Sequence, residues 1–88
     1  MPRRRGLLSR LGKKFWSRHG HRLRVTRLTL RLSEQECAKA HGVTLATYRK
    51  WEAGGEQRGN DGTLRFARKF NISLDWLISG DAGITGLQ

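Results

Sequence analysis

The sequence lacks features that mark three classes of protein. Its single cysteine, Cys37, cannot form an internal disulfide, and a lone thiol fits a reducing cytosol. No apolar run approaches the roughly 20 residues that span a bilayer. No long apolar stretch follows the basic start, which argues against a secretory signal. With 88 residues, the chain suffices for one small domain but leaves little room for an enclosed active site.

Acidic residues are absent from the first 31 positions, which contain eleven Arg and Lys residues. Residues 32–88 contain seven residues of each sign, so the formal net charge of +11 comes entirely from the N-terminal part. A block of one sign usually indicates a polyanionic partner, either nucleic acid or an anionic membrane. The alternative is a disordered tail that only keeps the protein soluble.

Residues 1–17 interleave these cations with leucines and aromatic residues. Leu7, Leu11 and Phe15 recur at i, i+4 and i+8, which is typical of a basic amphipathic helix. Two glycines in the same segment argue against a regular helix. We therefore expect a basic N-terminal arm that is at most partly helical.

The His-Gly-His segment at residues 19–21 is interpreted as a joint, and a helix is expected over residues 22–32. Leu23, Arg27 and Leu30 fall on one face of that helix at i, i+4 and i+7. The face places an arginine between two leucines. A buried arginine needs a carboxylate partner, because an unpaired charge in the core is costly.

The next two helices carry clear end signals. Ser33 followed by Glu36 is the pattern of a capping box, which starts a helix. Gly42 is expected to end that helix in a left-handed conformation, and Thr44 to cap the following one. Two helices joined by three or four residues around a glycine have the spacing of a helix-turn-helix.

The remaining residues predict a loop and two more helices. Residues 54–62 are rich in glycine and polar residues, as loops are. A fourth helix is expected from about Asp61 or Thr63 to Phe70, and a fifth over 74–79. The sequence thus predicts an all-α fold of five short helices. The expected divisions are a basic N-terminal arm over 1–19, a helix-turn-helix domain over 20–82 and a flexible tail over 83–88.

Two segments resemble a known family. Residues 33–54, SEQECAKAHGVTLATYRKWEAG, resemble the helix-turn-helix of phage repressor/Cro (XRE-type) proteins, whose pattern includes Gly-Val-Ser/Thr and Trp-Glu-x-Gly. Residues 73–80, SLDWLISG, resemble the family's closing Ser-x-Asp-Trp-Leu-x-x-Gly. The resemblance covers about residues 20–82. It implies a cytoplasmic, nucleoid-associated transcription regulator that binds double-stranded DNA, and a homodimer is a further expectation.

The resemblance also assigns roles to residues. It implies that Arg27 pairs with Glu52 as a structural ion pair, which agrees with the inner position of Arg27. Periodicity places Tyr48 and Trp51 on the buried side of the third helix, and the opposite side would meet a DNA groove. A basic arm would lie on the backbone or in a minor groove. The residues expected to contact DNA are Thr44, Leu45, Ala46, Thr47, Arg49, Lys50, Gln35, Arg3, Arg4 and Arg5.

The sequence departs from the family pattern at two places. Many members carry a phosphate-binding glutamine where this chain has Glu34, which a phosphate would repel. Gln35 is the candidate substitute, although it points about 100° away on a helix. Leu45 and Ala46 stand where polar base-reading residues are frequent, so specificity is expected to be low or based on DNA shape.

Other functions are weighed against DNA binding. The leucines and aromatic residues among the N-terminal cations also resemble a membrane-surface anchor, and antitoxins of this fold bind a protein partner. The His and Cys residues are too few and wrongly spaced for a zinc site. No catalytic triad, carboxylate pair or phosphate-cradling loop is present, so neither an enzyme nor a cofactor or small-molecule substrate is expected. The only candidate surface for a dimer consists of Trp76, Ile78, Ile84 and Leu87.

Overall fold

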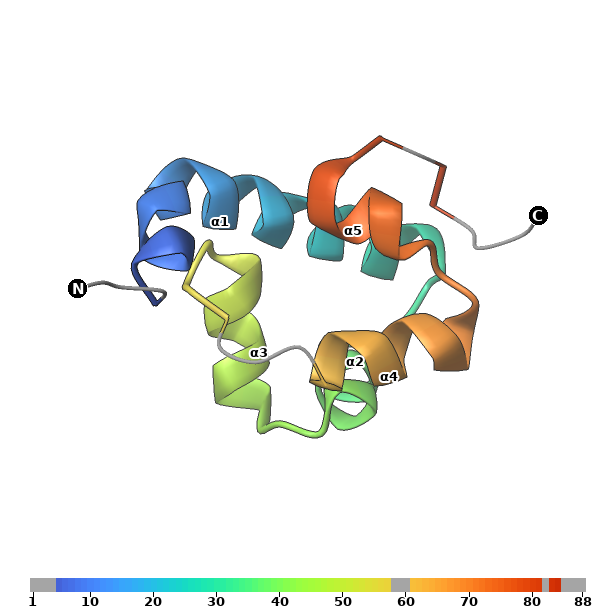
Figure 1. Ribbon diagram of the computed structural model, residues 1–88. Coiled ribbons are helices and arrows are strands. Elements are labelled where there is room, and N and C mark those ends of the chain that lie inside the picture. The colour runs from blue at the N-terminus through green and yellow to red at the C-terminus, as the bar shows by residue number, and fades with distance from the viewer. Residues whose placement is uncertain (1–4, 58–60, 82, 85–88) are drawn as a thin grey trace.

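The computed structural model describes residues 5–57, 61–81 and 83–84, and of residues 5–11 and 61 only the backbone. Within these residues the chain forms five α-helices, arranged as Figure 1 shows. The prediction of an all-α fold with five helices is confirmed. The helices are α1 (Arg5–Thr29), α2 (Glu34–His41), α3 (Leu45–Glu52), α4 (Asp61–Phe70) and α5 (Leu74–Ser79).

Helix α1 differs most from the sequence-based expectation. It begins at Arg5, well before residue 22, and ends at Thr29. A kink at Gly12, which has φ 62° and ψ −167°, separates the first turns from the remainder. The helix then runs without a break through residues 19–21, so the interpretation of this segment as a joint is wrong. The boundary drawn between residues 19 and 20 therefore falls inside a continuous helix.

Gly20 lies within α1 because α3 comes too close for any larger residue. A Cβ atom built on Gly20 would overlap the carbonyl oxygen of Trp51 and lie 2.9 Å from that of Glu52. The glycine thus allows the end of α3 to abut the side of α1. This reason for a glycine lies in another helix, and a glycine read from sequence alone suggests a break instead.

The caps of α2 and α3 form as predicted. The Ser33 hydroxyl accepts a hydrogen bond from the Glu36 N–H (3.0 Å), and the Glu36 carboxylate accepts one from the Ser33 N–H (2.7 Å). Gly42 ends α2 in the left-handed conformation, with φ 76°. Thr44 caps α3 and accepts a hydrogen bond from the Thr47 N–H at 3.2 Å. Two short helices thus meet at a three-residue turn.

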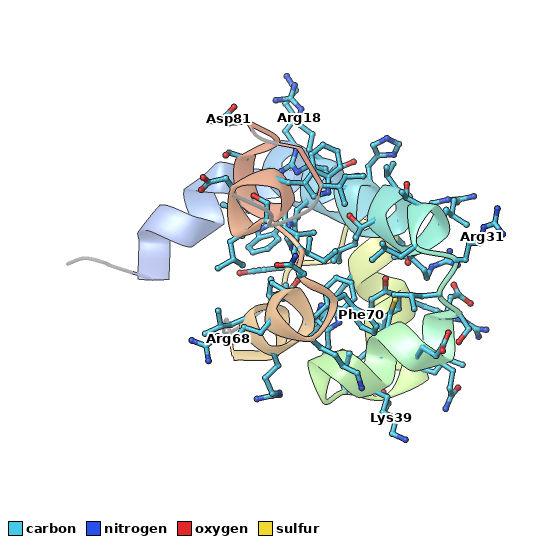
Figure 2. The ribbon with its side chains drawn as sticks, turned by 90° about the vertical axis from the view of Figure 1, so that its right-hand side faces the viewer. Arg18, Arg31, Lys39, Arg68, Phe70 and Asp81 are labelled. Atoms are coloured by element: carbon cyan, nitrogen blue, oxygen red, sulfur yellow. The ribbon has the colours of Figure 1, made fainter. Side chains whose placement is uncertain are left out.

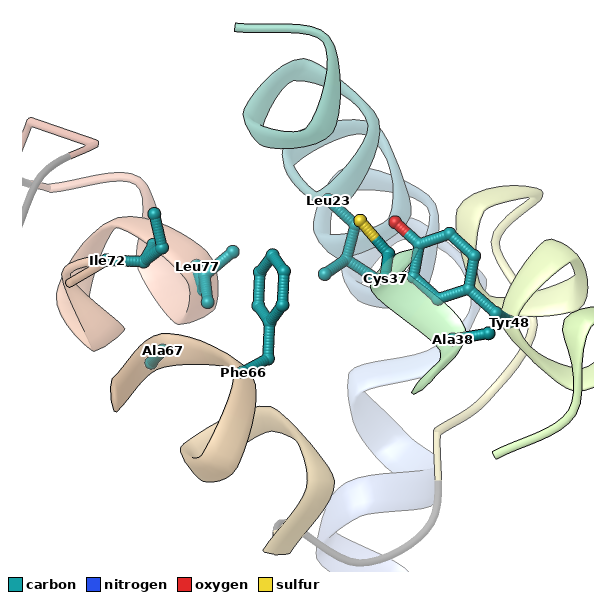
Figure 3. Packing of buried hydrophobic residues seen from close by; sticks show 8 residues of the cluster. All are labelled: Leu23, Cys37, Ala38, Tyr48, Phe66, Ala67, Ile72 and Leu77. Atoms are coloured by element: carbon teal, nitrogen blue, oxygen red, sulfur yellow. The ribbon is translucent and has the colours of Figure 1, made fainter. Parts of the chain in front are cut away.

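The core is one cluster to which every helix contributes. Helix α2 packs against α3 and α4, while α1 packs against α3 and α5. Figure 3 shows the ring of Phe66 between Leu77 on one side and Leu23 and Cys37 on the other. The buried apolar members are Leu23, Cys37, Ala38, Tyr48, Phe66, Ala67, Ile72 and Leu77.

A buried hydrogen-bonded chain ties α1 to the C-terminal half of the domain. The two ring nitrogens of His19 lie 2.7 Å from the Leu77 carbonyl oxygen and 3.0 Å from the Gln57 side-chain oxygen. The Gln57 amide also hydrogen-bonds the hydroxyl of Thr63. His19, Gln57 and Thr63 are all buried, so α1 is already part of the folded domain at His19. The sequence placed His19 in the arm and Gln57 in a polar loop.

Candidate nucleic-acid interface

One side of α3 is buried and the other is open to solvent. Tyr48 is fully buried and Trp51 is half-buried against the core. The expected DNA-contacting residues of this segment lie on the opposite side or at its N-terminal end. Thr44, Ala46, Arg49 and Lys50 are exposed, while Leu45 and Thr47 are half-buried.

The N-terminal end of α3 is ordered by its own side chains. The Thr44 hydroxyl donates to the Thr47 hydroxyl (3.0 Å) while accepting from the Thr47 N–H. The first N–H groups of a helix have no partner within it, and together with the helix dipole they favour an anion there. This end of α3 therefore suits a phosphate.

The C-terminal end of α3 is held by a buried ion pair. The structure brings Arg27 and Glu52 together: Arg27 Nε donates to Glu52 Oε2 at 2.7 Å, and Nη2 donates to Oε1 at 3.2 Å. The Tyr48 hydroxyl also donates to Glu52 Oε2, at 2.6 Å. The exposed fractions of the Arg27 and Glu52 side chains are only 14% and 9%. The carboxylate thus receives three hydrogen bonds in a largely dry setting.

These contacts set the ionisation of the group. Burial alone raises the pKa of Glu52, but the hydrogen bonds from Arg27 and Tyr48 outweigh it and hold the pKa below its ordinary value. The hydrogen bond to Glu52 raises the pKa of Arg27. Burial and the same carboxylate raise the pKa of Tyr48. The pair therefore stays ionised at neutral pH, with Tyr48 neutral beside it.

A second ion pair connects α2 with α3 on the surface. Arg49 Nε donates to Glu34 Oε1 at 3.1 Å, and both side chains are substantially exposed. Glu34 was expected to repel a phosphate and Arg49 to contact DNA, but the ion pair between them was not predicted. Gln35 is exposed one position further on. Glu34 and Arg49 are fifteen positions apart in the chain, so no local sequence pattern could reveal their contact.

Arg65 of α4 supports the turn between α2 and α3 and was missed in the sequence. Its Nη2 donates to the carbonyl oxygen of His41 at 3.1 Å, where the negative end of the α2 dipole lies. The guanidinium also covers Gly42, because a Cβ atom there would lie 2.6 Å from Nη2. A cation from α4 thus holds the turn that sets the angle between α2 and α3.

The structure describes only part of the N-terminal arm. Arg3 and Arg4 lie outside the described residues, as does the side chain of Arg5. Phe15 and Trp16 are half-buried and cluster with His19: the ring centroids of Phe15 and Trp16 are 4.8 Å apart, and that of Trp16 is 5.8 Å from that of His19. All three rings belong to α1, so these contacts lie within the helix, and neither aromatic side chain is fully open to solvent.

Some of the candidate dimer residues form contacts within the domain, and others do not. Trp76 Nε1 donates to the Thr26 hydroxyl at 2.7 Å, so this indole is held against α1. The carbonyl of Ile84 accepts a hydrogen bond from the Ser73 N–H at 2.8 Å. Ile78 is exposed, and Leu87 lies outside the described residues.

Comparison with known proteins assigns no family to this chain. No family model matches the sequence, and no curated protein or solved structure matches it either. None of the helices in the described part of the chain is long and apolar enough to cross a membrane. Among the described residues, no three or more His, Cys, Asp or Glu side chains are grouped as a metal ion would require.

Proposed function

We propose that the protein is a DNA-binding transcription regulator of the helix-turn-helix type, in which α3 enters the major groove. One observation carries the proposal: α3 is capped by Thr44, clamped at its far end through Glu52, and exposes Arg49 and Lys50 on its free side. The resemblance of residues 33–54 and 73–80 to repressor/Cro proteins supports the same function. The excess of positive charge supplies the attraction to a polyanion.

The roles on α3 follow from side-chain chemistry. N-terminal residues of a recognition helix reach base edges. Lys50 would donate to guanine O6 or N7, and the Ala46 methyl would meet a thymine methyl. The Thr47 hydroxyl, which accepts a hydrogen bond from Thr44, is free to donate to a phosphate together with the first N–H groups of the helix. Thr44 would donate to a phosphate only by giving up its hydrogen bond to Thr47. Because Leu45 is half-buried and apolar, we infer that much of the specificity comes from DNA shape.

Anionic membrane binding receives less support. An interfacial helix inserts its large apolar side chains into the lipid boundary. Phe15 and Trp16 instead contact each other and His19, with ring centroids 4.8 Å apart for the first pair. After the kink, α1 exposes four cations, Lys13, Lys14, Arg18 and Arg24, and one large apolar side chain, Leu28. This composition suits a phosphate backbone better than the interior of a lipid boundary.

Replacing Lys50 by glutamine tests the proposal. We expect about a tenfold loss of affinity for a duplex selected from a random pool, because one base contact is worth about 1–3 kcal/mol. The salt slope of log K is expected to fall by about one if Lys50 also releases a counterion. The measurement is fluorescence anisotropy with selected and random duplexes between 50 and 200 mM salt. Lys69→Gln, an exposed lysine of α4 with the same charge change, is the control.

Two results would overturn the function. The first is an absence of duplex binding by the unaltered protein at low salt. The second is an equal effect of the substitutions at Lys50 and Lys69, which would show that α3 has no privileged role.

Replacing Glu34 by glutamine is expected to strengthen DNA binding about fivefold. The change removes a negative charge beside the backbone and releases Arg49, whose surface ion pair is worth at most about 1 kcal/mol. Glu36→Gln is the matched control, because it removes the same charge from the same helix end without touching Arg49. Binding isotherms of both variants, and of each combined with Arg49→Gln, give the coupling. If Glu34→Gln and Glu36→Gln have equal effects, Glu34 has no specific influence on Arg49.

A further inference from the structure

The outer side of α1 carries cations along two edges that border different helices. Lys13, Ser17 and Arg24 are spaced i, i+4 and i+11, and at 3.6 residues per turn they form one row. Lys14 and Arg18, at i and i+4, lie further round the helix. All five side chains are exposed. No acidic residue occurs in α1 to neutralise either edge.

The first row borders the C-terminal end of α3. Gly20, one turn before Arg24, abuts the carbonyl groups of Trp51 and Glu52. A Cβ atom on Gly54, just after α3, would lie 3.3 Å from the Cα of Ser17. Arg24 is also close enough to Glu52 to help lower the pKa of that carboxyl group, although less than the hydrogen bonds do. This row therefore continues the surface that α3 presents.

The second edge faces α5. Arg18 adjoins Arg22, whose Nε and Nη2 donate to the carbonyl oxygens of Leu77 (3.0 Å) and Ile78 (2.8 Å) at the end of α5. Figure 2 shows Arg18 on the same side of the molecule as Asp81, next to α5. Cations of the same helix thus point to two different sides of the domain.

We propose that Lys13 and Arg24, with the Ser17 hydroxyl between them, bind phosphates of the duplex that α3 occupies, beyond the C-terminal end of α3. This inference rests on the proposed function and adds a second contact region to it. Lys, Arg and Ser are the residues that hold DNA backbones. The row is roughly 16 Å long, from eleven residues at 1.5 Å each, which matches about five base pairs of one strand at 3.4 Å per step.

The row is also held in place before DNA arrives. His19 and Gly20 fix this part of α1 to α5, Gln57 and α3. Cations on a docked helix lose less freedom on binding than cations on a flexible arm. The row would therefore act as a rigid extension of the α3 surface that lengthens the footprint on one side.

The test compares two double variants of the full chain. Lys13→Gln with Arg24→Gln removes both cations of the α3 edge. Lys14→Gln with Arg18→Gln removes the same charge from the same helix on its other edge. We expect the first variant to lower duplex affinity about tenfold and to reduce the salt slope by about two, since each phosphate contact contributes about 0.9. The second should change affinity less than threefold. Hydroxyl-radical footprinting should lose the flanking protection only in the first.

Each failure has a distinct meaning. Equal losses in the two double variants would overturn the inference, because they would reflect net charge alone. So would an unchanged footprint in the variant of Lys13 and Arg24. If Lys50→Gln weakens binding while both double variants bind normally, DNA binding by α3 stands and the α1 contact is rejected. Circular dichroism melting of all variants tests whether these exposed substitutions leave the fold intact, which we expect.

Discussion

Replacing Glu52 by glutamine is expected to lower the free energy of unfolding by about 3 kcal/mol, because it strands the buried charge of Arg27. Glu52 accepts two hydrogen bonds from Arg27 and one from Tyr48. A neutral amide can accept fewer of them, and its NH2 group faces donors. At roughly 5 °C per kcal/mol for a domain of this size, the melting temperature should fall by about 15 °C.

Thermal unfolding followed by circular dichroism at pH 7 measures this loss. Glu56→Gln, at an exposed glutamate four residues further on, is the control for lost charge and should change the melting temperature little. Tyr48→Phe removes one hydrogen bond and should cost about 1 kcal/mol. An unchanged melting point for Glu52→Gln would show that the ion pair does not stabilise the fold.

The same substitution has a consequence for DNA binding. Glu52 is the last residue of α3, and Arg27 and Tyr48 tie it to α1 and to the core. Loosening this end would let α3 change its angle against α2. We therefore expect the folded molecules of the Glu52→Gln variant to bind DNA more weakly than the unaltered protein, although Glu52 itself is not proposed to contact DNA.

Mild acid is expected to destabilise the protein through His19 and His41. Both imidazoles are buried, and burial lowers their pKa values below 6.5 against weaker opposing hydrogen bonds. As the pH falls through 6.5, the two histidines of the unfolded chain therefore bind protons, whereas those of the folded chain remain neutral. The stabilisation is complete above that pH and declines as the pH falls towards the folded pKa values. Each histidine contributes a slope of about 1.4 kcal/mol per pH unit in this window.

Nearby cations add to the effect of burial on both histidines. Arg22 lies near His19 and Arg65 near His41, and each guanidinium disfavours a further positive charge on the imidazole. His41 also stacks on Phe66, with ring centroids 4.5 Å apart, and its Nε2 has no hydrogen-bond partner among the described residues. The Glu52 carboxylate does not contribute in this window, because its pKa lies below its ordinary value of 4.5.

Urea unfolding at pH 7.5 and 5.5 measures the difference. We expect a loss of roughly 2 kcal/mol for the unaltered protein. His41→Phe should remove about half of this pH dependence, because phenylalanine suits the aromatic cluster and does not titrate. His21→Gln, at an exposed histidine of α1, should leave it intact. A flat stability between the two pH values would contradict neutral burial of the two side chains.

Local signals explain which parts of the fold the sequence could predict. The capping box of Ser33 and Glu36, the left-handed Gly42 and the cap at Thr44 each depend on residues within four positions of one another. The inner position of Arg27 followed from helical periodicity, and its partner Glu52 from the resemblance. The exposed side of α3 followed once Tyr48 was placed inside.

Contacts between distant segments were decided only by the tertiary structure. Gly20 stays helical because α3 packs against it, whereas glycine alone suggests a break. His19 and Gln57 are buried because each satisfies a hydrogen bond of the other. Glu34 and Arg49 meet because the turn at Gly42 folds α2 against α3. The sequence by itself thus determined the helices after α1 and their caps, since those depend on neighbouring residues. Packing alone decided how far α1 extends and which of its cations border α3, because both depend on close approach between segments far apart in the chain.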